Sequence, residues 1–361
     1  MVTIKAENLI DFVADVFGHA GSSREEARRI ATYLTTANLT GHDSHGVIRV
    51  PVYIRWNKIG SVVPNQTPEV VLDTPSLAVV DGKFGYGQTV TPVAVQIGIE
   101  KCKKAGLAAV ALRNAGHIGR VGDWAEMAAA EGLVSVHFVN AAGSLLVAPY
   151  GGVEKRLSTA PYCVGIPRQG QDPIVLDFAT SIVAEGKCLV ASRGGKPLPK
   201  GALIDCDGTL SEDPHVLYGP YMPDGPRDHT AGSGAIRAFG EHKGSGLAFI
   251  CELLGGGLTG TGATAPNRRF ANGMLAFYVD PDVIDTGNVF DEEITRYVAF
   301  IRATKPVASV EQVLIPGDPE RKTRAERGKN GIPLPDETWM AIVNTARELG
   351  VSEVSIQRAT S

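Results

Sequence analysis

The chain has 361 residues, of which 43% are hydrophobic and 20% are charged, and its formal net charge at pH 7 is −4. This length predicts about two domains with a core large enough to fold without disulfides. A nearly neutral chain has no broad positive field for nucleic acid, and its apolar runs are far shorter than a bilayer span. We therefore expect no nucleic-acid or membrane partner. The first residues also lack a signal-like pattern, so we expect a cytoplasmic protein.

The five cysteines are Cys102, Cys163, Cys188, Cys206 and Cys251, and none of them belongs to a C-x-x-C pair. Zinc sites, iron–sulfur clusters and redox disulfides usually contain such pairs. We therefore expect no metal centre of this kind and interpret the cysteines as small buried apolar residues.

The first 60 residues have the apolar spacing of amphipathic helices. A first helix is expected to end near Gly18. Ser23 followed three residues later by Glu26 is a capping box, which predicts a second helix up to about residue 40. A third helix is expected over 47–58, with Pro51 in its first turn, where proline costs no intrahelical hydrogen bond.

From about residue 75 the pattern alternates between strands and helices, which predicts a three-layer α/β domain with a largely buried sheet. The expected strands are 76–80, 107–113, 133–140, 162–167, 174–178, 273–280 and 297–303. The expected helices are 89–105, 121–131, 183–191, 243–254 and 333–349. The charged stretch 320–329 is expected to form a solvated face.

One glycine motif is misleading. Residues 255–260 match G-x-G-x-x-G, but they follow an apolar helix, whereas the dinucleotide fingerprint follows a strand. We therefore expect these glycines to cap that helix. Since no such fingerprint follows an early predicted strand, an ordinary Rossmann domain is not supported.

The densest polar cluster is the segment 41–46, followed by Arg49 and Tyr53. His45, Arg49 and Tyr53 are four residues apart, so they would line one edge of a helix that begins near Gly46. This combination suits a 2-oxo or 2-hydroxy acid, because the guanidinium can bind the carboxylate while the imidazole beside it delivers a proton. The alternative is that Ser44 caps the helix and His45 is structural. A metal site at His42, Asp43 and His45 is less favoured, because their spacing matches no known ligand pattern.

A second cluster, residues 114–122, joins a predicted strand to a predicted helix. Ligands of open α/β sheets bind at the carboxyl ends of strands, and amides at a helix N-terminus favour phosphate. Gly116, Gly119 and Gly122 would let a cofactor approach the backbone, and Arg120 would add a cation for a pyrophosphate. The alternative is an ordinary glycine-rich turn with His117 on the surface.

Five segments in the same order resemble the malate/L-lactate dehydrogenase family over nearly the whole chain: 41–46 with Arg49 and Tyr53, 114–122, 176–181, 241–246 and 314–318. The resemblance implies a fold like that of sulfolactate dehydrogenase and distinct from the Rossmann fold. Such a fold has a three-layer α/β/α domain around a mixed sheet and a helical domain built from both chain ends. We accordingly expect residues 1–75 and 311–361 to form a helical substrate and dimerisation domain, and residues 76–310 to form the α/β cofactor-binding domain. The family also implies a homodimer that completes the active site.

The resemblance further implies an NAD- or NADP-dependent oxidoreductase that interconverts a 2-hydroxycarboxylate and a 2-oxocarboxylate. His45 matches the family's proton donor, Ser44 its relay partner, and His117 a second histidine that could take the acid/base role. Arg49 and Tyr53 match substrate contacts. The implied dinucleotide contacts are His45, Gly119, Arg120, Val121, Val175, Leu176, Asp177, Phe178, Ala179, His242, Asn272, Gly317, Asp318, Pro319 and Glu320.

Two departures from the family concern the expected substrate-binding residues Thr159 and Lys187. Lys187 stands where imine-reducing members carry an acid, which argues against imine reduction. Residues 158–161 read Ser-Thr-Ala-Pro where the family usually has Gly-Thr-Asn-Pro, so an amide is lost beside the site. The alternatives are a cyclic imino acid reductase, a ureidoglycolate dehydrogenase and a ligand-binding protein without activity. The basic residues of 321–329 would either neutralise a 2′-phosphate or face solvent, so the choice between NAD and NADP stays open.

Overall fold

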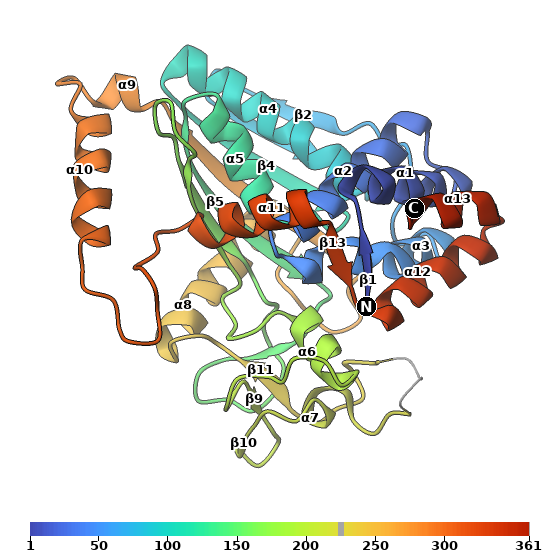
Figure 1. Ribbon diagram of the computed structural model, residues 1–361. Helices are drawn as coiled ribbons and strands as arrows, with labels where there is room; N and C mark the ends of the chain where they lie inside the picture. Colours follow the sequence, from blue (N-terminus) through green and yellow to red (C-terminus); the bar gives the residue numbers. More distant parts are fainter. Residues whose placement is uncertain (223–226, 361) are drawn as a thin grey trace.

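The computed structural model describes residues 1–222 and 227–360, and a seven-stranded mixed sheet forms its centre (Figure 1). In spatial order the strands are β2 (Glu69–Asp73), β3 (Leu77–Asp81), β4 (Leu107–Ala115), β12 (Ala271–Val279), β5 (Val134–Ala142), β7 (Tyr162–Ile166) and β8 (Ile174–Phe178). β3 and β4 pair in parallel, and the other neighbours pair antiparallel. The central strand β12 is buried along most of its length, as its apolar sequence predicts.

Helices cover both faces of this sheet. α4 (Gly87–Ala105) and α5 (Gly122–Ala130) pack on one face. α8 (His242–Cys251) and the π-helical turn Glu252–Leu258 pack on the other. Successive strand residues point to opposite faces, so Val139 joins the core beneath α4 and α5 while Phe138 joins the core beneath α8. The predicted three-layer α/β fold is confirmed.

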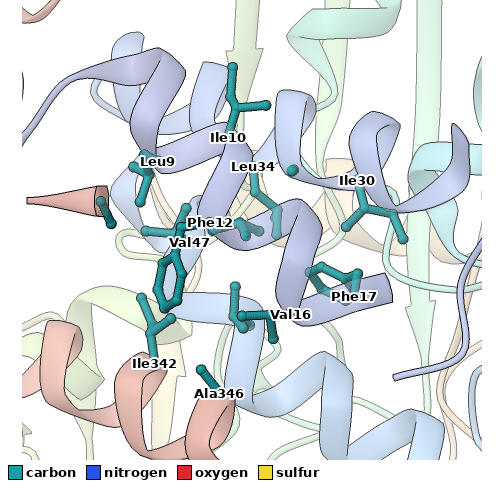
Figure 2. Packing of buried hydrophobic residues seen from close by; sticks show 14 of the residues in the cluster. Leu9, Ile10, Phe12, Val16, Phe17, Ile30, Leu34, Val47, Ile342 and Ala346 are labelled. Atoms are coloured by element: carbon teal, nitrogen blue, oxygen red, sulfur yellow. The ribbon is translucent and has the colours of Figure 1, made fainter. Parts of the chain in front are cut away.

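Both chain ends build a separate helical core. It contains α1 (Ala6–His19), α2 (Arg24–Leu39), α3 (Val50–Lys58), α12 (Asp336–Glu348) and α13 (Glu353–Ala359). Figure 2 shows Phe12 and Val16 of α1 packed with Leu34 of α2 and Ile342 of α12. In addition, β1 (Val2–Ile4) pairs antiparallel with β13 (Ile332–Leu334), so the two ends of the chain are joined by backbone hydrogen bonds as well as by side chains.

Two sequence signals at this core have clear structural outcomes. Ser23 caps α2 by accepting a hydrogen bond from the amide of Glu26 at 3.2 Å, as the capping box predicts. The carboxylate of Glu26 instead accepts from the amide of Asn65 and the hydroxyl of Thr89. The expected domain boundary at residue 75 would cut the β2–β3 hairpin, so the pairing favours a boundary before Glu69. The division into two domains otherwise remains a prediction.

A smaller four-stranded sheet was not expected from the sequence. Its strands, in spatial order, are β10 (Leu210–Ser211), β9 (Leu203–Ile204), β11 (Ala235–Arg237) and β6 (Val147–Ala148). α6 (Glu185–Ser192) and α7 (His215–Tyr218) pack around it through a third apolar core. Strands of two or three residues are too short to produce a recognisable alternation of polar and apolar residues.

The expected strand at 297–303 is wrong, because these residues belong largely to α10 (Phe290–Arg302). A run of apolar residues there resembles a strand, but the acidic first turn Asp291–Glu293 and the helical spacing of the apolar residues fit an amphipathic helix. α9 (Pro281–Ile284) precedes α10, and Figure 1 shows α10 standing apart from the other helices. Tyr297, Ala299 and Phe300 of α10 are exposed, and Val298 is the one buried residue of this helix.

The glycines at 255–257 do not cap a helix, which corrects a second expectation. They lie inside the π-helical turn that continues α8, and a Cβ at Gly255 would lie 2.7 Å from the carbonyl oxygen of Phe138. Gly255 and Gly256 therefore pack closely against β5, whereas Gly257 is exposed. Gly260, with φ of +92°, directly follows the C-cap residue Thr259, which is the capping position expected for a glycine of this motif. The solvated stretch 320–329 lies in a helix, α11 (Asp318–Asn330), which has no buried side chain. Four cysteines are buried as expected, whereas Cys206 is exposed.

Across residues 1–222 and 227–360, no helix is both long enough and apolar enough to cross a bilayer.

Candidate functional site

The segment around His45 is irregular, whereas the helix expected over 47–58 is present and differs only in that its first turn is 3-10. Two short 3-10 turns, Asp43–His45 and Val47–Arg49, precede α3. The side-chain oxygen of Asn38 accepts from the amide of Val47 at 2.8 Å, and its nitrogen donates to Asp43 at 2.6 Å. Gly46 packs directly on this asparagine, where a Cβ would clash. The segment is thus folded around Asn38 of α2.

His117 lies in the loop between β4 and α5, and the loop is held by buried amides. Asn272 of β12 accepts from the amide of Ile118 at 3.0 Å and donates to the carbonyl of Asn140 at 2.6 Å. Trp124 donates its indole N–H to the carbonyl of Ile118 at 3.2 Å. His117 is therefore not the surface residue of the alternative interpretation. Its ring stacks on that of His45, with centroids 5.5 Å apart and planes inclined by 17°.

Tyr53 reaches this histidine pair from α3. Its hydroxyl lies 2.6 Å from Nδ1 of His117, and Gln88 of α4 donates to the same hydroxyl at 3.1 Å. The tyrosine side chain is buried and packs against Phe17, Trp56 and Tyr86. In this chain Tyr53 therefore orients His117, whereas the sequence predicted a direct substrate contact, which remains untested.

Ser44 does not cap a helix; its hydroxyl lies 3.0 Å from Nδ1 of His45. The geometry is that of a hydroxyl beside an imidazole, as the expected relay requires. Burial lowers the pKa of His45 well below its ordinary value, and the nearby His117 and Arg49 lower it further. Burial, with a contribution from Arg49, also lowers the pKa of His117 to about 3. Both imidazoles are therefore neutral at pH 7, and an anion bound to Arg49 would oppose this shift.

Arg49 carries the positive charge of the site. Its Nε donates to the carbonyl of Ser44 at 2.7 Å, and its Nη2 lies 3.8 Å from a carboxylate oxygen of Glu185. The hydroxyl of Tyr218 donates to the other carboxylate oxygen of Glu185 at 2.7 Å. Gly186 lies against Ser44, where a Cβ would come within 2.5 Å of the serine Cβ. The N-terminal end of α6 therefore closes over the serine and the arginine.

Glu185 was not expected from the sequence, which pointed to its neighbour Lys187. Lys187 is exposed on α6, and the residue of this helix that faces Arg49 is Glu185. Gln88 was also missed. Both missed residues lie in ordinary helical sequence, so no local motif marks them, and only the packing of α4 and α6 on the site reveals their roles.

A hollow of about 290 Å³ lies between α5, β8 and α11. Its lining includes Val175, Gly317, Glu320, Arg168, Arg321 and Arg324. We call it the arginine hollow. The carboxylate of Glu320 lies 3.0 Å from Nε2 of His42. Because the rings of His42 and His45 are 6.5 Å apart, this contact links the arginine hollow to the histidine pair.

The sequence profile of the malate/L-lactate dehydrogenase family matches residues 4–343. The chain belongs to this family. Hydroxycarboxylate dehydrogenase B of Escherichia coli strain K12 is 38% identical over 98% of this chain and 96% of its own length. A solved Escherichia coli structure described as a malate/lactate dehydrogenase superposes with a TM-score of 0.91 at 36% identity, covering 99% of this chain and 98% of that one. Sulfolactate dehydrogenase from Methanocaldococcus jannaschii superposes with a TM-score of 0.84 at 30% identity over 100% of both chains.

Several residues expected to bind the dinucleotide in this family line or adjoin the arginine hollow. Val175 lies on β8, and Gly317, with φ of +93°, starts α11 and is followed by Asp318, Pro319 and Glu320. Asp318 forms an ion pair with Arg302 at 2.8 Å. These positions bring β8 and α11 to one place although about 140 residues separate them in the sequence, as a shared ligand site requires.

Other expected cofactor residues already have protein partners. Arg120 is buried and pairs with Asp123 at 2.8 Å and Glu126 at 2.7 Å, so its charge is balanced by two carboxylates. Asp177 accepts from the amide of Gly122 at the start of α5 at 2.7 Å. Gly119 adopts a φ of +73°, which glycine tolerates better than other residues. These contacts shape the loop around His117.

The remaining residues predicted to bind the dinucleotide do not line the arginine hollow. Val121 is buried before α5, Leu176 is 40% exposed, and Phe178 packs on Tyr162 and Phe239 ahead of Ala179. His242 is exposed at the start of α8, with its ring 5.9 Å from that of Tyr150. Their contact with a dinucleotide remains a prediction.

The segment 158–161 has an unusual backbone. Thr159 is half-buried, and its carbonyl accepts from the amide of Thr180 at 3.0 Å. Ala160 has a φ of +28°, near the left-handed region that asparagine adopts more readily than alanine. The usual asparagine of the family pattern therefore suits this backbone, and alanine keeps the shape without the amide.

The less favoured metal interpretation of His42, Asp43 and His45 fails on geometry. Asp43 pairs with Arg327 of α11 at 2.6 Å, and His42 faces Glu320. Within the part of the chain that the structure describes, no group of three or more histidine, cysteine, aspartate and glutamate side chains is arranged to hold a metal ion.

Proposed function

We propose that this protein is an NAD(P)-dependent 2-hydroxycarboxylate dehydrogenase that interconverts a 2-hydroxy acid and its 2-oxo acid. The observation that carries the proposal is the convergence of Arg49 with two neutral, stacked imidazoles in a partly buried site. A guanidinium suits the carboxylate of such a substrate, and imidazoles suit the adjacent oxygen. The names of the relatives support the same substrate class.

The residues around the site fit a nicotinamide dinucleotide. The arginine hollow is lined by three guanidinium groups, which suit phosphates, and by the carboxylates of Glu126, Asp172 and Glu320, which suit ribose hydroxyls. Glu320 also contacts His42, whose ring is close to His45. Val175, Gly317, Glu320 and the loop at 116–121 would hold the cofactor. When bound, it supplies or accepts the hydride at C2 of the substrate. NAD and NADP both fit this proposal.

Arg49 would orient the substrate. Its Nε is engaged by the carbonyl of Ser44, which fixes the plane of the guanidinium, while Nη2 faces Glu185 at a distance longer than a hydrogen bond. A substrate carboxylate can therefore bind the Nη atoms without breaking a strong protein contact. This fixed arrangement holds C2 in position for hydride transfer.

His45 would move the proton. In the oxidative direction neutral His45 accepts the proton of the substrate hydroxyl. In the reductive direction it must first take up a proton, which a substrate anion bound to Arg49 favours, and the imidazolium then donates that proton to the oxygen that becomes the hydroxyl. Ser44 lies on the far nitrogen of the ring and can exchange a proton with it. A His45→Asn variant is expected to lose about 10²–10⁴ in turnover with nearly unchanged cofactor affinity. Unimpaired turnover would remove His45 from the mechanism.

We also propose a homodimer, supported by the unburied apolar face of the α9–α10 arm. Tyr297 is 56% exposed and Phe300 66%, and Val283 and Ile284 nearby are also exposed. Apolar residues gathered in this way usually mark an interface. Light scattering after size exclusion tests this, and a monomer at micromolar concentration would contradict it.

The deciding experiment follows nicotinamide absorbance with NADH and NADPH in parallel. The substrates are pyruvate, oxaloacetate, 2-oxoglutarate, phenylpyruvate and one cyclic imino acid. Oxidation of NADH or NADPH in the presence of a 2-oxo acid supports the dehydrogenase proposal, and the dinucleotide that is oxidised is the cofactor. Oxidation with the imine alone would favour imine reduction, and no oxidation would favour ureidoglycolate-type substrates or a binding protein.

A further inference from the structure

A chain of three buried groups ends on the histidine pair. Gln88 donates its side-chain N–H to the hydroxyl of Tyr53 at 3.1 Å, and that hydroxyl lies 2.6 Å from Nδ1 of His117. Gln88 and Tyr53 are each 1% exposed. Bulk water therefore does not compete for these hydrogen bonds, and their direction has a lasting effect on the imidazole.

The direction follows from counting protons. The tyrosine oxygen accepts a hydrogen bond from Gln88, so its own proton can be donated. Nδ1 of His117 is 2.6 Å from this oxygen and the carbonyl of His117 is 3.4 Å from it, so the proton points to Nδ1. If the Gln88 amide were flipped, its nitrogen would occupy the present position of Oε1. No group in the described chain forms a hydrogen bond at that position, so both N–H groups would lack a partner. Orphaned buried N–H groups are rarer than under-satisfied carbonyls. Nδ1 of His117 is thus an acceptor, and the ring proton lies on Nε2.

The two histidines differ in this respect. Ser44, the neighbour of His45, is a hydroxyl that either donates or accepts, so both ring tautomers of His45 are allowed. His117 has one allowed tautomer, and no protein group among residues 1–222 and 227–360 pairs with its Nε2. That Nε2–H is consequently available to a ligand.

We propose that Tyr53, aligned by Gln88, is a positioning residue that holds His117 as the neutral Nε2–H tautomer, so that His117 donates a hydrogen bond to the reacting substrate oxygen while His45 transfers the proton. This inference rests on the proposed function. In the reductive direction the hydride forms the C–H bond at C2, the carbonyl π bond becomes an alkoxide, and His45 supplies the proton that forms the hydroxyl. His117 keeps its proton throughout, so its part is to stabilise the developing negative charge.

The tautomer can be measured without substrate. In histidine-labelled protein, the two ring ¹⁵N shifts of His117 distinguish a protonated nitrogen from an unprotonated one, and loss of the signals in a His117→Gln variant assigns them. We expect Nε2 protonated and Nδ1 unprotonated at pH 7. A protonated Nδ1 with an unprotonated Nε2 would overturn the proposal. Because no turnover is involved, this result stands apart from the outcome of the substrate panel.

An isosteric variant should reverse the direction of the hydrogen bonds that join residue 88, Tyr53 and His117. In Gln88→Glu an ionised carboxylate accepts the tyrosine proton, so the tyrosine oxygen must accept from His117 and the ring proton moves to Nδ1. The ¹⁵N shifts of His117 should exchange as pH rises through the titration of the introduced carboxyl. Tyr86→Phe is the matched control, because the Tyr86 hydroxyl bonds neither Tyr53 nor His117 and its removal should leave the shifts unchanged. A folded Gln88→Glu protein whose shifts never change would refute the assignment.

Kinetics then separate the roles of the two histidines. The amide of His117→Gln still offers an N–H near the position of Nε2, so we expect kcat to fall about tenfold. The pH profile of kcat should keep both its acid and its alkaline limb. His45→Gln cannot exchange a proton, and its kcat should fall by about 10²–10⁴. An equal or larger loss in His117→Gln, with loss of the acid limb of the pH profile, would reverse the assignment. Tyr53→Phe should lower kcat more than it raises KM, because it disturbs the donor and leaves Arg49 in place.

Discussion

The two histidines of the site are held by different kinds of interaction. The His45 segment is folded around Asn38 and is tied to α11 by charge: Arg327 pairs with Asp43 and also donates to the carbonyl of Asn38 at 2.6 Å. The His117 loop is held by buried contacts, which are the neutral hydrogen bonds through Asn272 and Tyr53 and the buried ion pairs of Arg120 beside them. Charged contacts near the surface weaken with salt, whereas buried neutral networks do not. The difference suggests a rigid donor at His117 facing a more adjustable proton carrier at His45.

The largest expected effect comes from the charge that faces both imidazoles. Arg49→Met should lower kcat/KM for a 2-oxo acid by about 10²–10³, because a charge-assisted contact to the carboxylate is lost in a partly buried site. Cofactor affinity, measured by fluorescence titration, should change little. Arg55→Met in the following helix α3 is the control, since Arg55 is exposed. Equal kcat/KM values for the two variants would contradict the assigned role of Arg49.

The next effect tests the neutral side of the comparison. Asn272→Ala leaves the amide of Ile118 and the carbonyl of Asn140 without their partner, so the free energy of unfolding should fall by about 3 kcal/mol. Urea denaturation measures this. Asn330→Ala, at an exposed position on α11, should change it by less than about 0.5 kcal/mol. A small effect at Asn272 would show that the loop around His117 has another support.

How far the sequence predicts this site depends on how local the interactions are. The capping box at Ser23 and the long strands β4, β5 and β12 were predictable because a few neighbouring residues determine them. The convergence of His45, Arg49 and Tyr53 was also predictable, but its form was not. The helix expected over 47–58 is present, but its first turn is a 3-10 turn whose Val47 amide bonds to Asn38, and Tyr53 points inward to His117.

Long-range partners set the rest. Gln88 and Glu185 reach the site from α4 and α6, and nothing in their local sequence distinguishes them from ordinary helical residues. The amphipathic helix α10 was mistaken for a strand because residues 297–301 form a short continuous apolar run, which periodicity alone does not distinguish from a strand. Sequence periodicity indicates which residues are buried, but it does not indicate which element they pack against.

A pH experiment sharpens the comparison at His117. Its pKa in the folded protein is about 3, below the ordinary value of 6.5, so the unfolded chain binds more protons between these values. The free energy of unfolding therefore falls as pH drops, by about 2 kcal/mol between pH 7 and pH 5 from this residue. His45 contributes with the same sign. His117→Gln should remove this share of the decline, measured by urea denaturation at both pH values. An unchanged decline would mean that His117 is not buried in its neutral form.

The smallest effect concerns the charged support of His45. Arg327→Met removes the ion pair with Asp43 and the hydrogen bond to Asn38, and because both partners are partly solvated the unfolding free energy should fall by only about 1 kcal/mol. The loss should shrink as sodium chloride is raised from about 0.05 to about 1 M, since salt already weakens the pair in the unmodified protein. Arg347→Met, which breaks the exposed pair with Glu353, controls for general surface charge. If the segment from Asp43 to Arg49 depends on this arginine, kcat should fall in Arg327→Met and stay unchanged in Arg347→Met. A loss of stability that is insensitive to salt would place the support of His45 in packing, and the contrast between the two histidines would disappear.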